Sequence, residues 1–342
     1  MITLDQAFAQ MGLKGLFIVW GAFQGSRRSE QITKRFNIDL EYVYFTTKRG
    51  LLYAPFKYTF QAIATLVLLA RRRPDVVFIQ NPPIFGALFV YLYSLVFGTK
   101  FIIDTHTGPL IYPHWRWTLP LQRFLSRRAL TTILTNEHLA QEVASWRVSS
   151  FVLEDPPMTF EIAKPMTMKE STLNVVMVSV AYPDEPVAEM VQVARNLPDM
   201  DFYITGDFTN STYFQDIVRN APCNVHFTGF LREDYFALLE AVDVIVCLTT
   251  DDHTFLSGAN EALWVGRPLI TSDWSVLRHY FNKGTVHVDN TAESIQQGLL
   301  EIQKNFSDFQ AGILALQEER RRQWCEKAEA LLLLIQQNTL RT

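Results

Sequence analysis

The hydrophobic positions of this 342-residue chain fall into short continuous runs, separated by longer stretches with helical spacing. Apolar runs bounded by turn residues are typical of buried strands. Strands that alternate with helices predict parallel α/β sheets. Two such series occur, with strands predicted at residues 15–20, 41–45, 76–80, 100–104, 131–135 and 150–153, and then at 174–180, 201–205, 224–228, 242–248, 268–271 and 285–288.

Helical patterns fill the gaps between these strands, and one of them is notably apolar. Residues 84–98 form a 15-residue run without charge. This run is shorter than the roughly 20 residues that a membrane-spanning helix requires, so it predicts a buried helix between two strands. Further helices are predicted at residues 58–72, 119–128, 188–196, 233–241 and 292–304, with a long terminal helix at about 309–337.

The two series predict two doubly wound, Rossmann-like α/β domains. The run EDPP (154–157) and the loosely patterned segment 158–172 predict a linker between them. We expect an N-terminal domain at 1–158, a C-terminal domain at 172–308, and a terminal helix at 309–342 that packs back towards the N-terminal domain. Two such sheets in tandem are expected to face each other across a cleft, with ligands at the carboxyl ends of the strands.

The net charge of −4 conceals opposite balances in the two halves of the chain. Residues 1–160 contain 17 Lys or Arg and 10 Asp or Glu, whereas the remainder contains 14 and 25. A basic half that is also rich in aromatic residues suits the surface of an anionic membrane, and a merely solvated surface is the alternative. No nucleic-acid-binding motif is present, so nucleic acid is not expected as a partner.

The cysteines and the N-terminus indicate the compartment. Cys223, Cys247 and Cys325 share no CxxC spacing, so they predict neither a disulfide framework nor a zinc cluster. The N-terminal segment has an early acid and no long apolar core, unlike a signal peptide. We therefore expect a cytoplasmic protein.

The first candidate site lies in the loop after the first predicted strand. Gly21 and Gly25 bracket this loop, Ser26 can cap the next helix, and Arg27 and Arg28 suit an anion, with surface charge as the alternative. Such a loop can present amides to an acceptor or phosphate group at a helix N-terminus. Ordinary turn formation is the alternative, and the spacing is not that of a GxGxxG dinucleotide motif.

The second candidate site is a histidine at the end of another predicted strand. His106 follows Asp104 by two positions, directly after the strand at 100–104. A neighbouring carboxylate can orient an imidazole and favour its charged form, which suits a general base. A histidine with a purely structural role is the alternative.

The third candidate site is the junction SGANE between a strand and a helix. Ser257 is expected to cap this helix, and Gly258, Ala259 and Asn260 are expected to offer first-turn amides to a phosphate or diphosphate. Glu261 lies one turn further on. Because like charges repel, it does not suit phosphate, but its oxygens suit the hydroxyls of a ribose. The alternative is a capped helix with an exposed glutamate.

Other strand ends in the second half contribute small or apolar residues. Gly206 follows one predicted strand, and Phe230 and Leu231 follow another, so they are expected to line the same side of the cleft unless they only form turns. Asp251 and Asp252 have no further ligands at a suitable spacing. We therefore expect no metal site and no cofactor.

Residues 227–281 resemble the donor-binding region of GT-B glycosyltransferases, especially the large retaining family 4. Members of that family carry two Glu residues separated by seven positions, then a small-residue helix and Gly-x-Pro. Glu261 matches the second Glu, and the motif GRP after it matches Gly-x-Pro. His253 stands at the position of the first Glu, which in the family lies near the transferred sugar. We therefore count His253 with His106 as a candidate catalytic residue.

The N-terminal half is more similar to the chitobiosyl-diphosphodolichol β-mannosyltransferases. Residues 76–108 share with them Gln-Asn-Pro-Pro after one strand and Asp-x-His after the next. Family 4 enzymes usually place an Arg and a Lys after the first strand of the second domain to hold the diphosphate. This chain has VSVAYPDEPVAEM there, and the β-mannosyltransferases likewise have a Ser-rich segment. The similarity extends over roughly residues 15–300.

The resemblance implies a metal-independent glycosyltransferase that uses a UDP- or GDP-linked sugar. The acceptor would be lipid-linked or a polysaccharide, in cell-envelope or exopolysaccharide synthesis, and the protein would be peripheral on the inner face of the membrane. The base of the donor would lie near Phe230 and Leu231, its ribose on Glu261, and the acceptor in the first domain. A sugar-nucleotide epimerase of the same fold is one alternative. A non-catalytic binding subunit is another, favoured by His253 and by the missing Arg and Lys.

Overall fold

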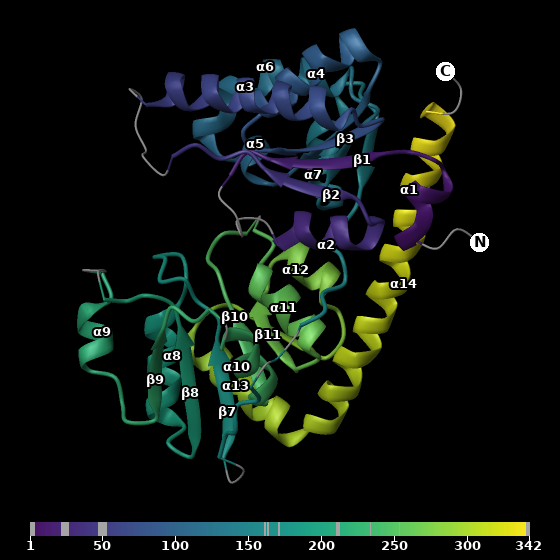
Figure 1. Ribbon diagram of the computed structural model, residues 1–342. Coiled ribbons are helices and arrows are strands. Elements are labelled where there is room, and N and C mark those ends of the chain that lie inside the picture. Colours follow the sequence, from purple (N-terminus) through teal and green to yellow (C-terminus); the bar gives the residue numbers. More distant parts are fainter. Residues whose placement is uncertain are drawn as a thin grey trace. The chain divides into compact units, whose positions relative to one another are not determined.

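The structure is a computed structural model that divides the chain into two compact units. Unit 1 comprises Met1–Pro157 and Arg322–Thr342, and unit 2 comprises Met158–Arg321. Both are α/β units with a parallel sheet (Figure 1). The structure describes residues 4–21, 27–46, 53–160, 162, 164–169, 172–209, 213–232, 234–252 and 254–339.

Unit 1 contains a six-stranded sheet in the order β2-β1-β3-β4-β5-β6, and every strand pair is parallel. The six strands predicted for the first half are all present. The second lies two residues earlier than predicted, because Leu40 and Tyr42 are the side chains that pack against the core. The strands are β1 Gly15–Val19, β2 Asp39–Tyr42, β3 Val76–Asn81, β4 Lys100–Thr105, β5 Thr131–Leu134 and β6 Ser150–Val152.

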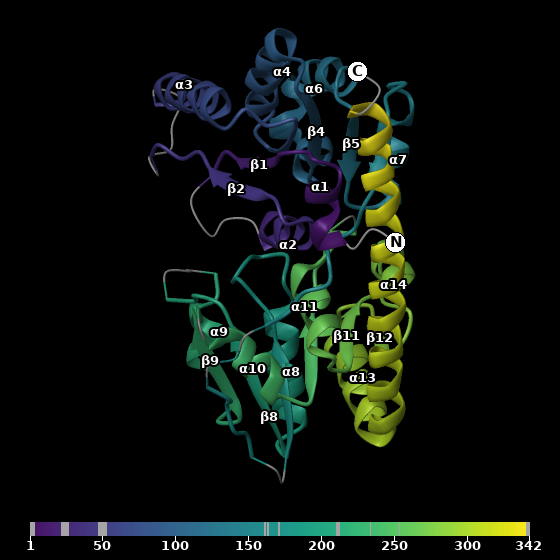
Figure 2. The same cartoon turned by 45° about the vertical axis from the view of Figure 1, so that its right-hand side comes forward.

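Successive residues of the unit 1 strands point to opposite faces, and each face is covered by helices. Leu16 and Ile18 pack with α3, α4 and α6, whereas Phe17 and Val19 pack with α1, α2 and α14. Figure 2 shows α3, α4 and α6 together on one side of β1. The helices are α1 Ala7–Gln10, α2 Arg27–Phe36, α3 Ala54–Arg72, α4 Phe85–Phe97, α5 Gly108–Ile111, α6 Leu119–Ser126, α7 Glu137–Ala144 and α14 Phe306–Thr339, with 3-10 turns η1 Leu4–Gln6 and η2 Pro113–Thr118.

The C-terminal part of α14 belongs to the core of unit 1. Trp324 and Leu331 are buried in the same cluster as Phe36 and Phe78. The rings of Trp324 and Phe36 are stacked with centroids 6.2 Å apart. The indole Nε1 of Trp324 also donates a hydrogen bond of 3.1 Å to the carbonyl oxygen of Glu154. The last turns of the chain therefore complete one face of the N-terminal sheet.

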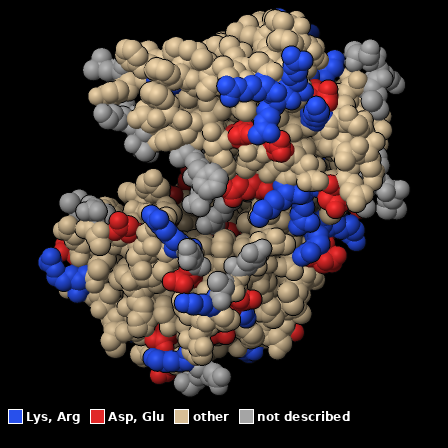
Figure 3. All heavy atoms as spheres, viewed as in Figure 1, with Lys and Arg blue, Asp and Glu red and all other residues tan. Residues whose placement is uncertain are grey.

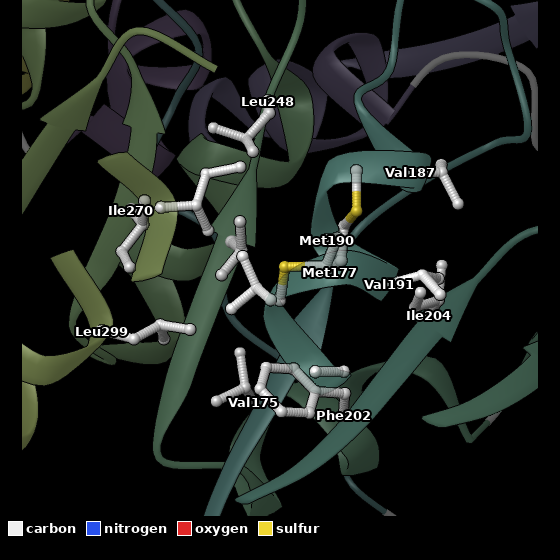
Figure 4. Packing of buried hydrophobic residues seen from close by; sticks show 14 of the residues in the cluster. Val175, Met177, Val187, Met190, Val191, Phe202, Ile204, Leu248, Ile270 and Leu299 are labelled. Atoms are coloured by element: carbon white, nitrogen blue, oxygen red, sulfur yellow. The ribbon is translucent and has the colours of Figure 1, made fainter. Parts of the chain in front are cut away.

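Unit 2 repeats the architecture with a second parallel sheet, in the order β12-β11-β10-β7-β8-β9. Its core joins strand residues such as Val175 and Phe202 to Met190 of α8 and Leu299 of α13 (Figure 4). The elements are β7 Leu173–Met177, α8 Val187–Asn196, β8 Met200–Thr205, α9 Gln215–Arg219, β9 Val225–Gly229, α10 Tyr235–Ala241, β10 Val244–Cys247, α11 Ser257–Val265, β11 Leu269–Ser272, α12 Ser275–Tyr280, β12 Thr285–Val288 and α13 Ala292–Lys304.

Two expectations from the sequence were wrong in part. The segment 158–172 is not a free linker, because the ring of Phe160 stacks on Phe236 of α10 with centroids 4.0 Å apart. The apolar run at 84–98 does form a helix, α4, but this helix is not buried throughout. Leu95 and Val96 in its last turn are exposed, with Val96 reaching 74%. Among the helices that the structure describes, none is both long and apolar enough to cross a bilayer.

Candidate functional site

The strand order of each sheet locates its most suitable ligand-binding edge. In unit 1, β1 lies between β2 and β3, so the strand order reverses direction at β1. In unit 2, β7 lies between β8 and β10, so the order reverses at β7. Ligands of doubly wound sheets bind at the carboxyl ends of the strands beside such a reversal. The loops after β1, β3 and β4 and those after β7 and β10 are therefore the regions to inspect.

In unit 1 the ends of β3 and β4 bring His106 and Asp104 together. The imidazole Nε2 of His106 lies 3.5 Å from Oδ2 of Asp104, at the outer limit of hydrogen bonding. The backbone amide of His106 donates a 3.0 Å hydrogen bond to the carbonyl oxygen of Asn81, which extends the pairing of β3 with β4. The neighbouring carboxylate expected from the sequence is therefore present beside His106.

Arg28 of α2 holds Asp104 in its ionised form. Its Nη2 lies 3.0 Å from Oδ1 of Asp104, its Nη1 donates to Asp155 at 2.8 Å, and Nη2 also donates to the carbonyl oxygen of Leu153 at 2.9 Å. Burial opposes ionisation of Asp104, but the charge of Arg28, together with nearby His106, outweighs it and lowers the pKa of the carboxyl below its ordinary value. Asp104 therefore stays an anion under His106.

Among the described residues, three polar atoms at the ends of β3 and β4 are buried and have no hydrogen-bond partner in that part of the chain. They are Nδ2 of Asn81, Oγ1 of Thr105 and Nε2 of His106. Asn81 and Thr105 are paired in register in the sheet, and His106 is the next residue. Buried polar atoms are nearly always hydrogen-bonded in proteins, so neighbouring exceptions mark a place that a ligand group can occupy.

Four predicted site residues, three in the loop after β1 and His253 in unit 2, are not fully described. Gly25, Ser26 and His253 lie outside the described residues, and of Arg27 only the backbone is described, at the start of α2. Gly21 is described and partly exposed directly after β1. The phosphate-loop and His253 hypotheses therefore stay predictions.

In unit 2 the first turn of α11 differs from the expectation. The N-cap is Leu256 and has no side-chain capping bond, so Ser257 is the first helical residue and not the cap. The amides of Gly258 and Ala259 are directed at the buried sulfur of Cys247, and the amide of Asn260 donates to the carbonyl oxygen of Leu256. The amide of Asn260 is therefore already bonded within the helix, and the sulfur of Cys247 lies beside Gly258. The binding of a diphosphate by this turn stays a prediction.

Gly258 is required at this position because α11 approaches β10 closely. A Cβ atom there would lie 2.6 Å from Cγ1 of Val178 and 2.8 Å from Sγ of Cys247. Burial raises the pKa of the Cys247 thiol well above its ordinary range, and Glu261 and Glu185 raise it further. The sulfur is therefore neutral, and the small residue serves helix–sheet packing.

Glu261 is buried at 5% exposure in the second turn of α11, unlike the exposed glutamate of the alternative interpretation. Its Oε2 accepts a short hydrogen bond from the hydroxyl of Tyr235 in α10. A buried carboxylate is costly unless hydrogen bonds compensate it. Tyr235 thus fixes the orientation of the group that the sequence assigned to a ribose.

The loop after β7 forms a small cradle of amides that is filled by the chain itself. The carboxylate of Glu185 accepts hydrogen bonds from the amides of Val180 and Tyr182, both at 3.0 Å, and from the hydroxyl of Ser179 at 2.6 Å. Ala181, between the two donors, has φ +63°, the left-handed conformation found in anion-binding nests. This is the segment in which the family resemblance leads one to expect Arg and Lys.

The loops after β7 and β10 are joined by side-chain and backbone bonds. The hydroxyl of Thr249 donates to Oδ2 of Asp184 at 2.7 Å, and the amide of Thr250 donates to the carbonyl oxygen of Asp184 at 2.8 Å. Gly206, at the end of β8, has φ +114°, and a Cβ there would lie 3.0 Å from the carbonyl oxygen of Ser179. The small residue is therefore needed for the approach of this loop.

Phe230 and Leu231 follow β9, as the sequence predicted. Phe230 is 71% exposed, and Leu231 packs partly against the core that includes Tyr235. An exposed ring beside a ligand-binding edge can stack on a nucleotide base.

Among the described residues, no group of three or more His, Cys, Asp or Glu side chains could hold a metal ion.

Sequence reasoning missed the roles of four residues of these sites. Arg28 looked like a possible anion ligand or surface charge, Asp155 like part of a linker, and Glu185 had no assigned role. Arg28 and Asp155 are 127 positions apart, whereas Glu185 bonds to residues three to six positions before it. For Tyr235 the sequence carries no signal, because its partner becomes apparent only when α10 packs beside α11.

Comparison with known proteins agrees with this organisation. Residues 184–316 match the sequence model of the family described as "Glycosyl transferases group 1". No curated protein matches the chain by sequence.

Solved structures match nearly the whole chain. Sucrose-phosphate synthase from Thermosynechococcus elongatus has a TM-score of 0.73 at 11% identity, with 96% of this chain and 100% of that chain covered. HepE from Anabaena, in complex with UDP and glucose, has a TM-score of 0.65 at 13% identity, with 93% and 100% covered. A putative UDP-N-acetylglucosamine 2-epimerase from Listeria monocytogenes has a TM-score of 0.65 at 10% identity, with 96% and 97% covered.

At these low sequence identities, the similarity to solved structures shows the fold alone. Each of the two units is a parallel-sheet α/β domain, and sucrose-phosphate synthase and HepE cover 96% and 93% of this chain. The chain therefore has the GT-B fold, and its second unit carries the sequence pattern of group 1 glycosyl transferases.

Proposed function

We propose that this protein is a glycosyltransferase that moves a sugar from a UDP- or GDP-linked donor to a glycan or lipid-linked acceptor. The observation that carries the proposal is the buried, oriented carboxylate of Glu261 within the segment that matches group 1 glycosyl transferases. The similarity to HepE, whose structure contains UDP and glucose, supports a nucleotide-sugar donor.

Unit 2 would bind the donor. Glu261, held by Tyr235, would accept hydrogen bonds from the ribose hydroxyls, and Phe230 would stack on the base. The diphosphate would lie towards the N-terminus of α11, where the helix dipole favours negative charge. Because the amide of Asn260 is already bonded within the helix, the helix dipole and Ser257 would supply part of the interaction with the diphosphate.

Unit 1 would bind the acceptor near the ends of β3 and β4. His106 would remove the proton of the acceptor hydroxyl, and the anionic Asp104 would stabilise the imidazolium that forms. The loop containing Gly21 and Arg27 stays a candidate for a phosphate group of the acceptor. We propose that the reaction needs no metal, since oriented dipoles can balance the leaving diphosphate.

The acceptor would belong to cell-envelope or exopolysaccharide synthesis, and the protein would work as a peripheral protein on the inner face of the membrane. The basic balance of residues 1–160 supports this location.

The first test is ligand binding to the unmodified protein. The cognate nucleotide should raise the melting temperature, because a ligand that binds only the folded state stabilises it. Transfer should then be measured with that donor. The variant His106→Ala should lower the turnover number by about a hundredfold or more, the usual contribution of a general base. Unchanged transfer by both His106→Ala and Glu261→Ala would contradict the proposal.

The epimerase alternative is separated by leaving out the acceptor. An epimerase converts UDP- or GDP-sugar by itself, whereas a transferase needs an acceptor. Epimerised sugar nucleotide after incubation without acceptor would replace the proposal with that alternative. If no nucleotide changes the melting temperature, a non-catalytic subunit is favoured instead.

A further inference from the structure

The outer face of α3 in unit 1 is apolar although it is exposed. Phe56, Phe60, Ile63 and Val67 recur at spacings of three and four residues, so they form one stripe along the helix. All four are exposed, with Phe56 at 67% and Ile63 at 55%. The opposite side of the same helix is buried in the core, so α3 is apolar on both faces.

Further apolar side chains are exposed on α4, which packs beside α3. The hydroxyl of Tyr93 in α4 donates a 3.0 Å hydrogen bond to the carbonyl oxygen of Leu69 in α3, which joins the C-terminal turns of the two helices. Leu95 and Val96 are exposed in this part of α4. We call the six exposed side chains Phe56, Phe60, Ile63, Val67, Leu95 and Val96 the α3–α4 face.

The charged residues near this face are mostly basic, although Arg72 at the C-terminal end of α3 pairs with Asp39 and Glu41. The segment 42–136, which contains both helices, carries eleven Lys or Arg but only two Asp or Glu. One of the two acids, Asp104, is buried against Arg28. Figure 3 shows few charged side chains over α3 itself, and Lys and Arg gathered beyond its C-terminal end with some Asp and Glu beside them. Arg71 and Arg73 are exposed there.

We propose that the α3–α4 face docks unit 1 onto an anionic lipid bilayer, with α3 lying in the plane of the interface. A contiguous exposed apolar surface marks a protein or a membrane contact. A bilayer matches both features of the face, since its acyl region takes the apolar stripe and its anionic headgroups attract the basic border. Trp117, close to Phe85 at the start of α4, is exposed and of the type that prefers the headgroup level.

This inference deepens the proposed function, since it rests on the membrane location given there and names the surface responsible. It does not depend on the transfer reaction. Vesicle binding requires no donor, and the nucleotide effect on the melting temperature requires no bilayer. The two ideas can therefore fail separately.

The experiment is co-sedimentation of the full-length protein with vesicles. Vesicles that contain phosphatidylglycerol should bind the protein more tightly than pure phosphatidylcholine, and added salt should weaken the binding. The variants Ile63→Glu and Val96→Glu should each lower the vesicle affinity by about tenfold or more, because a charge enters the buried part of the contact. Ile63→Leu should bind like the unmodified protein.

The matched control is Leu300→Glu, an exposed leucine of α13 in unit 2. It should leave vesicle binding unchanged, and all variants should keep the same melting temperature and the same nucleotide-induced shift. If Ile63→Glu and Val96→Glu bind vesicles normally, the proposal is wrong. If instead they convert a dimer into a monomer, the face joins two copies of the chain and the bilayer proposal is also overturned.

Discussion

At the scale of single residues, the buried charges of this protein occur in compensated groups. Arg28 is surrounded by Asp104, Asp155 and a backbone carbonyl. Glu261 is paired with the Tyr235 hydroxyl. Taking an ion out of water costs several kcal/mol unless such partners are present. Side chains of this kind are held in one orientation, which is the condition that a binding or catalytic group must meet.

The role of Glu261 is tested by removing its charge and by removing its partner separately. Glu261→Gln should raise the donor KM about tenfold or more, since a hydrogen bond to a charged group contributes about 1.5–3 kcal/mol. Tyr235→Phe should raise it only a few fold, because it loosens the carboxylate and leaves its charge. Glu240→Gln, on the exposed side of α10, is the control and should leave steady-state kinetics unchanged. Equal KM values for all three variants would rule out ribose binding.

The Arg28–Asp104 pair predicts a loss of stability in acid. The folded state lowers the pKa of Asp104 below the model-peptide value of 3.8, so its stabilising contribution is complete above that value. It should disappear as the pH falls from about 4 through the lower pKa of the folded state. Asp104→Asn should cost about 3–5 kcal/mol at neutral pH, since it leaves Arg28 without its main partner, and should flatten the acid dependence.

The control for this prediction is Asp39→Asn, which removes an exposed partner of Arg72. Exposed pairs contribute about 0–1 kcal/mol. Urea unfolding at several pH values compares the two variants. An Asp104→Asn protein with the same pH profile as the unmodified protein would contradict the assignment.

At the scale of elements, side chains of the protein itself lie against the backbone amides that follow two of the strands, β7 and β10. The carboxylate of Glu185 occupies the amide cradle after β7, and the sulfur of Cys247 faces the first turn of α11. These contacts order loops that would otherwise expose amides. They also distinguish this chain from the family pattern, in which basic residues of the same loop hold the diphosphate.

Replacing Glu185 should therefore mainly lower the free energy of unfolding, and affect the transfer reaction less. Glu185→Ala should lower the free energy of unfolding by about 1–3 kcal/mol, because three donors lose their acceptor. Glu185→Gln should be less costly, since it keeps an acceptor oxygen. Glu318→Gln, on an exposed side chain of the same unit, serves as the control and should be neutral. Thermal unfolding that is identical for Glu185→Ala and the unmodified protein would exclude the bracing role.

At the scale of the whole molecule, α14 takes part in both cores. Ile313 and Leu316 are buried in unit 2, whereas Trp324 and Leu331 are buried in unit 1. Lys327 of the same helix pairs with Glu154 at 2.5 Å. The sheet of unit 1 thus relies on a helix that lies far from its strands in sequence, so unit 1 is complete only when Trp324 and Leu331 are packed in place.

Truncation of Trp324 tests this dependence. Trp324→Ala should cost about 3–5 kcal/mol, the usual loss for a large aromatic side chain removed from a core. Leu333→Ala, an exposed residue of the same helix, should stay near the unmodified value. Denaturant unfolding followed by circular dichroism compares them. An unchanged midpoint for Trp324→Ala would show that the helix end does not stabilise unit 1.

Most of the fold can be predicted from the order of residues, because strands buried on both faces are continuous apolar runs. All twelve predicted strands are present, and the doubly wound arrangement follows from their alternation with helices. The position of Glu261 at a strand–helix junction was also predictable, since local spacing places it one turn into α11. These features depend on neighbours in the sequence.

Which side chains pair with each other depends on neighbours in space, and the sequence alone did not predict these pairs. The fold brings Arg28 to Asp104 from 76 positions away and directs the amides of Gly258 and Ala259 at Cys247. Among the described residues, it also leaves the apolar side chains on one side of α3 exposed. Periodicity records which residues are apolar, but only the packing of elements decides which of them are covered and which charges meet.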